Sequence, residues 1–284
     1  VTTPYYARLL VEGQRIGDIF IEPAKINVTP AERKFESNGS LNSSLEEMQN
    51  KLGAIVTEFR ALPQDSTSAE RAEILSKRYD AILDSTMTAN IDNALGYLLF
   101  ISNAQNYDLA ELDAALAKYP KFKDSQRVKS IRQRLVVKDE TSVGHKYKDF
   151  AITNDGKTQK LSDFLGNDHY TLVDFWASWC GPCIREISVI KKLYEKYNGK
   201  GLNFLGVAVW DEPQNTQKAI EDHQIPWDVI VNAQTIPTDL YGISGIPCII
   251  LIAPDGTIVS RDQQDEDLVR DVEQAMSEFN KANE

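Results

Sequence analysis

The spacing of hydrophobic residues divides the 284-residue chain into three parts. Residues 1–40 hold short β-prone runs between Gly and Pro, which predicts a small, partial β domain. Within residues 41–136, apolar side chains recur every three or four positions among charged ones, which predicts a helical subdomain. Strand-like and helical runs then alternate over residues 137–284. The fold class that we predict is α/β for this last part, preceded by a mostly helical region and a small β segment.

Composition and charge exclude several classes of function. The chain has 31 basic and 42 acidic residues, a net charge of -11 and a pI near 4.9, so nucleic acid is not an expected partner. No apolar run approaches the roughly 18 residues of a membrane span, so we expect no transmembrane segment in this chain. The sequence begins at Val1 without a signal-type segment, so we expect that a leader was removed or the sequence trimmed.

Two of the three cysteines are separated by two residues, in the segment Trp179-Cys180-Gly181-Pro182-Cys183. An apolar strand precedes the pair and a helix is expected to follow it, which places Cys180 at the start of that helix. Unpaired N–H groups and the helix dipole favour a thiolate there, and lower the thiol pKa from about 8.5 toward 7 or below. Cys180 can then attack a disulfide, and Cys183 can resolve the mixed disulfide. Pro182 suits the first helical turn, because its missing N–H would be unpaired in any case.

This segment resembles the active site of the thioredoxin-like family, and residues 173–177 match the strand that precedes it. The resemblance implies a central mixed sheet flanked by helices in the C-terminal part. It also implies that Cys180 is the nucleophile, that Cys183 is the buried resolving thiol, and that Asp174 accepts the proton of Cys183. Burial would raise the pKa of such a carboxyl toward the operating pH. No cofactor is expected beyond the redox-active disulfide Cys180–Cys183, and no metal.

The resemblance further implies a substrate-binding surface around the cysteines. Ile246-Pro247 precedes an apolar strand, where thioredoxin-like proteins carry a cis-proline that faces the disulfide. By resemblance Pro247 is cis, and the backbone of Ile246 pairs with an extended substrate segment. Gly181 and Pro182 belong to the same surface. Trp179 is expected to contact substrate, whereas Trp176 is expected in the core.

Three positions near the motif needed separate interpretation. Ser188 stands where the family has a helix-kinking proline, which predicts a straighter helix. Cys248 stands where the family has Thr; a small buried hydrophobe is the favoured interpretation, and a regulatory or mixed-disulfide partner is the alternative. Glu186 matches a common acid of one branch of the family, and a solvated helix face is the equally weighted alternative.

That branch is the envelope-bound redoxins, of the AhpC/TSA-redoxin and TlpA/ResA-like kind, which the chain resembles in its length, in its layout and in Gly39-Ser-Leu-Asn42. The resemblance implies a reductase of protein disulfides that is exported to the periplasm or cell envelope. A lipid anchor in a missing N-terminus and an upstream thiol electron donor, itself membrane-borne, are implied as well. The helical region is expected to serve docking or dimerisation.

Three other functions were weighed against this prediction. A peroxiredoxin-like thiol peroxidase would carry Thr or Ser three residues before its reactive cysteine, but Ala177 stands there. A zinc site needs a second ligand pair that the sequence lacks, and its three histidines show no ligand spacing. A non-catalytic binding module would not require an intact Cys-Gly-Pro-Cys. The prediction is therefore a thiol–disulfide oxidoreductase.

Overall fold

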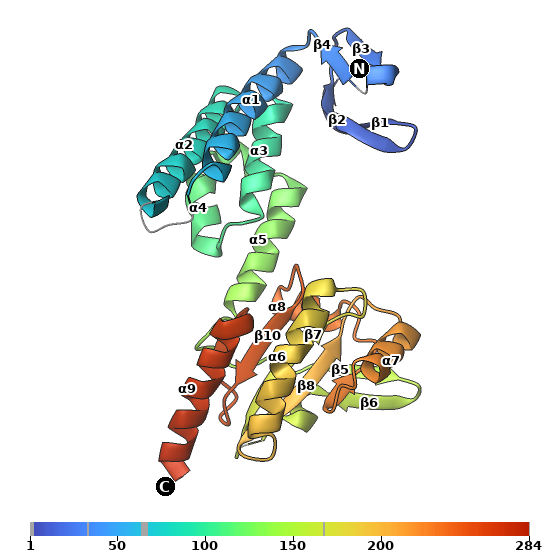
Figure 1. Cartoon of the computed structure of the whole chain (residues 1–284), viewed down its shortest axis with the longest axis vertical. Helices are drawn as coiled ribbons and strands as arrows, with labels where there is room; N and C mark the ends of the chain where they lie inside the picture. Colours follow the sequence, from blue (N-terminus) through green and yellow to red (C-terminus); the bar gives the residue numbers. More distant parts are fainter. Residues whose placement is uncertain (1–2, 33, 64–67, 167, 284) are drawn as a thin grey trace. The chain divides into compact units, whose positions relative to one another are not determined.

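The computed structural model describes residues 3–32, 34–63, 68–166 and 168–283 (Figure 1). The described residues divide into two compact units, which cover residues 1–129 and 130–284. The boundary lies inside one helix, α5 (Gln126–Asp139), and the predicted β and helical parts together form the first unit. The three-part division at residues 40 and 136 stays a prediction.

The N-terminal unit begins with two antiparallel hairpins. The first joins β1 (Tyr5–Val11) to β2 (Gln14–Ile21), and the second joins β3 (Ile26–Thr29) to β4 (Lys34–Ser37). The sequence predicted the first three strands. It missed β4, whose four residues include two charged side chains and give little apolar signal.

The Gly39-to-Asn42 segment links the hairpins to the first helix. The buried carboxylate of Glu22 accepts the backbone N–H groups of Leu41 (3.2 Å) and Asn42 (3.0 Å), so it caps the unpaired donors of that helix start. The Asn42 amide pairs with both backbone groups of Phe20, at 2.8 Å each. A Cβ at Gly39 would lie 2.0 Å from the Glu22 carboxylate, so only glycine leaves room for this cap.

Helices make up the rest of the first unit. They are α1 (Ser40–Arg60), α2 (Ser68–Ala89), α3 (Ala94–Ala104) and α4 (Leu109–Lys118), followed by a 3-10 turn at Pro120–Phe122. The most apolar helix is α3, and its Phe100 is fully buried against the rings of Tyr119 and Phe122. Asp108 and Glu111 form a capping box at the start of α4.

Within the described residues, five strands build the central sheet of the C-terminal unit, in the order β11-β10-β7-β8-β9. They are β7 (Tyr170–Trp176), β8 (Leu202–Ala208), β9 (Asp228–Ile230), β10 (Cys248–Ile252) and β11 (Ile258–Arg261). The β7, β8 and β9 strands are parallel, whereas β10 runs antiparallel to both β7 and β11. This is the mixed sheet of the thioredoxin-like fold, and it confirms the predicted fold class.

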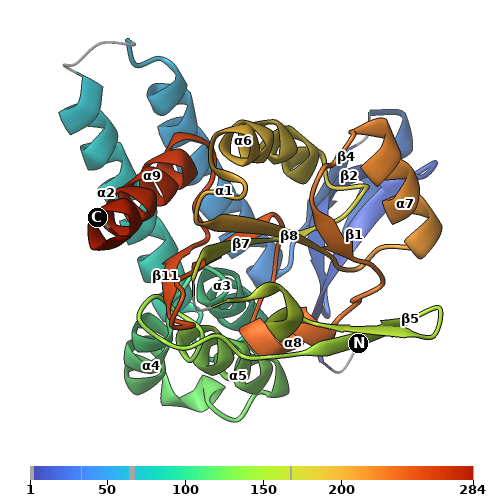
Figure 2. The ribbon, with the colours of Figure 1, turned by 90° about the horizontal axis from the view of Figure 1, so that it is seen from below.

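Helices and a hairpin cover the two faces of this sheet (Figure 2). One face carries α6 (Gly181–Tyr197), α9 (Asp265–Asn283) and apolar residues of α7 (Pro213–Asp222) and the segment after it. The other face carries α8 (Ile236–Tyr241), the hairpin of β5 (Ala151–Asn154) and β6 (Lys157–Lys160), and the 3-10 turn Leu161–Phe164. We call the first the cysteine face, because its core includes Cys180 and Cys183, and the second the opposite face.

The end of α5 belongs to the C-terminal unit and is held there by a buried arginine. Arg261 donates to the carbonyl oxygens of Thr141 (2.7 Å) and Tyr241 (2.6 Å). A Cβ at Gly242 would lie 2.5 Å from the Arg134 carbonyl, so this glycine allows α5 to pack closely. Within the described residues, no helix combines the length and apolarity needed to cross a membrane.

Candidate active site

The strand β7 delivers the cysteine pair to the start of α6. The strand is buried over most of its length, and a short turn follows in which the Cys180 N–H donates to the Ala177 carbonyl (3.1 Å). Cys180 is the N-cap residue of α6, with Gly181 and Pro182 exposed in the first turn. The predicted placement of Cys180 at the beginning of the helix is therefore confirmed.

The two cysteines form a disulfide, with 5.2 Å between their Cα atoms. The Cys180 residue is 4% exposed and Cys183 is 0% exposed, so the second sulfur lies beneath the first. The backbone N–H of Cys183 donates to Cys180 Sγ at 3.1 Å. When the pair is reduced, this N–H and the positive end of the helix dipole stabilise the thiolate form of Cys180.

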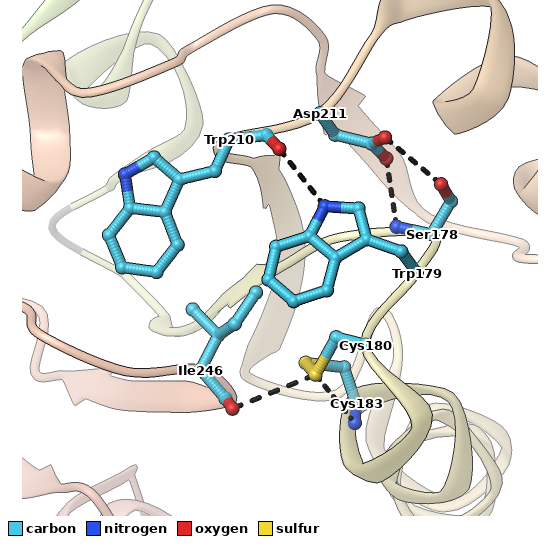
Figure 3. Close-up of a disulfide and its surroundings, with 7 residues drawn as sticks. All are labelled: Ser178, Trp179, Cys180, Cys183, Trp210, Asp211 and Ile246. Atoms are coloured by element: carbon cyan, nitrogen blue, oxygen red, sulfur yellow. Dashed lines mark hydrogen bonds between the residues drawn. A yellow bond between two sulfur atoms is a disulfide. The ribbon is translucent and has the colours of Figure 1, made fainter. Parts of the chain in front are cut away.

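The loop before β10 lies against the disulfide, as Figure 3 shows. The Ile246–Pro247 peptide bond is cis, as predicted. The carbonyl oxygen of Ile246 lies 3.6 Å from Cys180 Sγ, and both residues of the loop are partly exposed. The structure thus brings this dipeptide next to the cysteines, although Cys183 and Ile246 are far apart in the sequence.

Asp174 lies on the cysteine face of β7. Leu172 and Trp176 lie two positions before and two positions after Asp174 on the strand, so they share its face. Both pack in the same cluster as the two cysteines. The residue is 3% exposed, and no donor among the described residues bonds to its Oδ1. Burial, with a smaller effect from the nearby Glu186 carboxylate, raises its pKa to about 8. The carboxyl is therefore poised to exchange a proton near neutral pH.

Glu186 lies one turn into α6 and is also buried, so the solvated-face interpretation is wrong. Its Oε1 accepts the backbone N–H of Asp265 at 3.0 Å, at the beginning of α9. Burial raises the pKa of Glu186 even though this hydrogen bond opposes the change. Burial therefore raises the pKa of two carboxyl groups on the cysteine face, Asp174 and Glu186.

The segment after β8 reaches the site and was missed in the sequence analysis. Trp179 is 61% exposed, yet its indole N–H donates to the carbonyl oxygen of Trp210 at 3.0 Å. The buried Asp211 accepts hydrogen bonds from the Ser178 N–H (2.8 Å) and hydroxyl (3.0 Å). A signal was available, because Trp210 directly follows a predicted strand and the carboxyl ends of neighbouring parallel strands meet at one edge of a sheet.

Comparisons with known proteins agree with this geometry. Residues 143–261 match the model of the AhpC/TSA family. This part of the chain is an AhpC/TSA domain. Over 122 residues, the chain is 28% identical to the thiol-disulfide oxidoreductase ResA of Geobacillus thermodenitrificans, which covers 43% of this chain and 69% of that protein. ResA of Bacillus subtilis is 25% identical over 123 residues, or 43% of this chain and 68% of its own length.

The chain is also similar in sequence to a domain of known structure. The thioredoxin domain of a thiol-disulfide oxidoreductase from Bacteroides vulgatus is 31% identical, covers 47% of this chain and 96% of its own, and has a TM-score of 0.42. The sequence matches to ResA and the paired cysteines of the AhpC/TSA domain make it a thiol-disulfide oxidoreductase.

The third cysteine of the AhpC/TSA domain lies on the opposite face. Cys248 is 2% exposed and packs among apolar side chains there, with its Sγ 3.1 Å from Asp262 Oδ1. Burial, and then the Asp262 charge, raise its pKa well above the ordinary value. A buried, protonated thiol on the other side of the sheet favours the small-hydrophobe interpretation. Across the described ranges, His, Cys, Asp and Glu side chains form no cluster of three that could hold a metal ion.

Proposed function

We propose that this protein reduces disulfide bonds of protein substrates, with Cys180 as the attacking group and Cys183 as the resolving group. The observation that carries the proposal is the disulfide at the start of α6, with a buried proton-exchanging carboxyl, Asp174, on the same face of the sheet. The proposal assigns attack to Cys180, resolution to Cys183 and proton transfer to Asp174.

In the first step, the Cys180 thiolate attacks one sulfur of the substrate disulfide. A bond forms between Cys180 Sγ and that sulfur, and the other substrate sulfur leaves as a thiolate and takes a proton. The position of Cys180 supports this role, because its Sγ accepts the Cys183 N–H and its residue is the more exposed of the two cysteines.

In the second step, Cys183 loses its proton and attacks Cys180 Sγ. The second substrate sulfur leaves as a thiol and the Cys180–Cys183 disulfide forms. The substrate disulfide has then been reduced by two electrons, and the cysteine pair has been oxidised by two electrons. We assign the proton transfer to Asp174, whose pKa of about 8 suits it to accept the thiol proton and release it again. Glu186 adds to the proton affinity of Asp174 through its charge.

In this proposal, the exposed and partly exposed residues around the disulfide form the substrate-binding surface. Ile246 and Pro247 offer a short length of backbone beside Cys180, and Gly181 and Pro182 leave the approach free of large side chains. Trp179, which is largely exposed, contacts the substrate in this proposal.

The direction and the location of the reaction rest on the resemblance to envelope redoxins. A Gly-Pro spacer is typical of reducing members, so we propose net reduction in the periplasm or cell envelope. The cycle then needs a dithiol donor, proposed to be membrane-borne, which reduces Cys180–Cys183 and becomes a disulfide itself.

A Cys183→Ser variant tests the proposal, because it stops the reaction at the mixed disulfide. We expect it to retain substrate proteins through a bond that dithiothreitol breaks, and a Cys180→Ser, Cys183→Ser double variant to retain none. Cys248→Ala in the Cys183→Ser background is the matched control and should trap the same partners. Equal trapping by the double variant would exclude Cys180 as the nucleophile. Fast, saturable consumption of hydrogen peroxide by the reduced protein would instead favour a peroxidase.

A further inference from the structure

Arg185 is an exposed residue of α6 whose cationic side chain lies over the first turn of that helix. Side chains on a helix lean toward its N-terminus, so a long side chain at position 185 reaches back over position 181. The Nη1 atom of Arg185 lies 3.8 Å from the point where a Cβ atom of Gly181 would stand. Because Gly181 directly follows Cys180, the guanidinium lies beside the neighbour of the proposed nucleophile.

The position of this cation opposes the electrostatics of the helix. The N-terminus of a helix carries a partial positive charge, so acidic residues stabilise the first turn and a cation destabilises it. The helix α9, which packs on the same face of the sheet, follows this rule with Asp265, Glu266 and Asp267 in its first turn. The first turn of α6 has no acidic residue, and Arg185 adds a positive charge there. Such a departure from a local rule is typical of functional sites.

The charge of Arg185 is not neutralised within the described part of the chain. Its guanidinium forms no ion pair or hydrogen bond with another described residue. The carboxyl groups of Asp174 and Glu186 lie on the same face of the sheet, but each residue is only 3% exposed. The exposed and partly exposed residues that flank the disulfide are uncharged, and they are Trp179, Gly181, Pro182, Ile246 and Pro247. The guanidinium is therefore available to a negative group of a binding partner.

A substrate that brings its sulfur to Cys180 also brings the neighbouring side chains close to this turn. An extended chain advances about 3.3 Å per residue, so a side chain next to the substrate cysteine can reach the space over Gly181. A guanidinium binds a carboxylate through two parallel, charge-assisted hydrogen bonds, whereas an amide of the same size gains much less from it. Arg185 can therefore distinguish an acidic neighbour of the substrate cysteine from a neutral one.

We propose that Arg185 is a specificity residue, which favours substrates with an aspartate or a glutamate next to the reactive cysteine. This inference rests on the proposed function and adds a substrate class to it. The occupant is an extended segment of the substrate protein. The whole chain has a net charge of -11, so an acidic partner is repelled at long range and is attracted locally, at the first turn of α6.

Two short peptides, blocked at both ends, test the proposal directly. They are Gly-Asp-Cys-Asp-Gly and Gly-Asn-Cys-Asn-Gly, which have the same shape and differ in charge. Each carries its cysteine as a mixed disulfide with pyridine-2-thiol. When Cys180 Sγ bonds to the peptide sulfur, pyridine-2-thiolate leaves, takes a proton and becomes the neutral, light-absorbing thione. The preference is the rate constant for the Asp peptide divided by that for the Asn peptide.

The preference is compared between protein variants, so that the intrinsic reactivity of each peptide cancels. We expect Arg185→Gln to lower the preference by about threefold at low ionic strength, which is the size of an exposed ion pair. The difference should shrink in about 0.5 M salt, which screens such a pair. Arg185→Lys keeps the charge and should keep most of the preference.

Lys192→Gln is the matched control for the loss of one positive charge. Lys192 is exposed on the same helix and stands seven positions after Arg185, which is about two turns further along the same face. We expect this variant to keep the wild-type preference, because its charge lies far from Gly181. A general effect of net charge would lower the preference equally in Lys192→Gln and Arg185→Gln.

The outcomes separate this inference from the function on which it rests. An unchanged preference in Arg185→Gln, an equal loss in Lys192→Gln, or an equal loss in Arg185→Lys would overturn the inference alone. The proposed function itself fails if the reduced protein releases the thione from neither peptide faster than the Cys180→Ser, Cys183→Ser double variant does, and the inference then fails with it.

Discussion

The two faces of the redox sheet place the same side chain in opposite chemical situations. On the cysteine face, Cys180 lies at the start of a helix and accepts an N–H from Cys183. On the opposite face, Cys248 lies within a strand and its thiol meets a carboxylate, Asp262. Helix donors stabilise a thiolate, whereas burial beside a negative charge keeps a thiol protonated. Position in the fold, and not residue type, therefore separates the proposed nucleophile from a buried thiol that favours its protonated form.

The largest expected effect is the loss of activity when the reactive cysteine is replaced. Cys180→Ser should lower the rate of insulin reduction by at least about 10³-fold, since the nucleophile of the first step is gone. Cys248→Ala should keep the rate within about twofold, because its thiol is buried on the other face. An insulin-reduction assay of both variants at equal concentration measures the two rates. Comparable losses of activity in the two variants would contradict the prediction.

A second prediction concerns the buried carboxyl on the cysteine face. Asp174→Asn should slow the resolution step by about 10²-fold at pH 7, the usual size of a general-base contribution. The mixed disulfide should then accumulate, which quenched-flow gel analysis would detect. The exposed Asp228→Asn on β9 is the control and should resolve at the wild-type rate. Wild-type resolution in Asp174→Asn would assign the proton transfer elsewhere.

The same substitution should change stability with a defined sign. Folding raises the pKa of Asp174 from 3.8 to about 8, so the folded protein binds an extra proton between these pH values. The contribution of Asp174 to stability therefore falls as the pH rises from about 4 to about 8. Asp174→Asn removes this dependence and should raise the free energy of unfolding at pH 7 by up to about 4 kcal/mol, at about 1.4 kcal/mol per pH unit. Urea unfolding of the oxidised protein at pH 5 and pH 7 measures it.

A third prediction compares the thiols by their rates of alkylation. In the reduced protein at pH 7, Cys180 should react with iodoacetamide at least about tenfold faster than Cys248, because the N–H donors at the start of α6 favour its thiolate. Cys248, which is buried and has a raised pKa, should react at an appreciable rate only after unfolding. Peptide mass spectrometry of a time course gives both rates. Similar rates would remove the distinction between the two faces.

The smallest expected effect concerns the carboxylates near the two thiols. Asp211→Asn should lower the free energy of unfolding by about 1–3 kcal/mol, because a buried acceptor of four hydrogen bonds among described residues is disturbed. Asp262→Asn should lower it by less than about 1 kcal/mol, since that side chain is 40% exposed and its ion pair with Lys138 is screened. Urea unfolding of both variants tests the order.

The sequence predicted the elements whose patterns are long and regular. The helical region of residues 41–136, the strand β7 and the helix α6 were all expected near their observed positions, because a face that is buried along its whole length leaves a clear period. The short elements β4, β9 and α8 were missed, since a few residues contain too little of any period. Their place depends on what they pack against.

The residues of the site likewise divide into those that the sequence predicted and those that only the structure revealed. Local sequence was enough to place Cys180 and Cys183 between a strand and a helix start, because both elements are encoded within a dozen residues. The resemblance to the thioredoxin-like family added Asp174. Trp210 and Asp211 come from the next parallel strand, and their role depends on hydrogen bonds across the sheet edge. The resemblance to known proteins correctly predicted the cis peptide bond between Ile246 and Pro247.

The sequence by itself determined the reactive motif and the class of its fold, because both depend on interactions between residues that are close along the chain. Only the tertiary structure decided which thiol is inert, how strongly Asp174 holds its proton, and which side chains surround the disulfide. Those properties come from burial and from the charges of distant segments, and neither is encoded at the residue that experiences them.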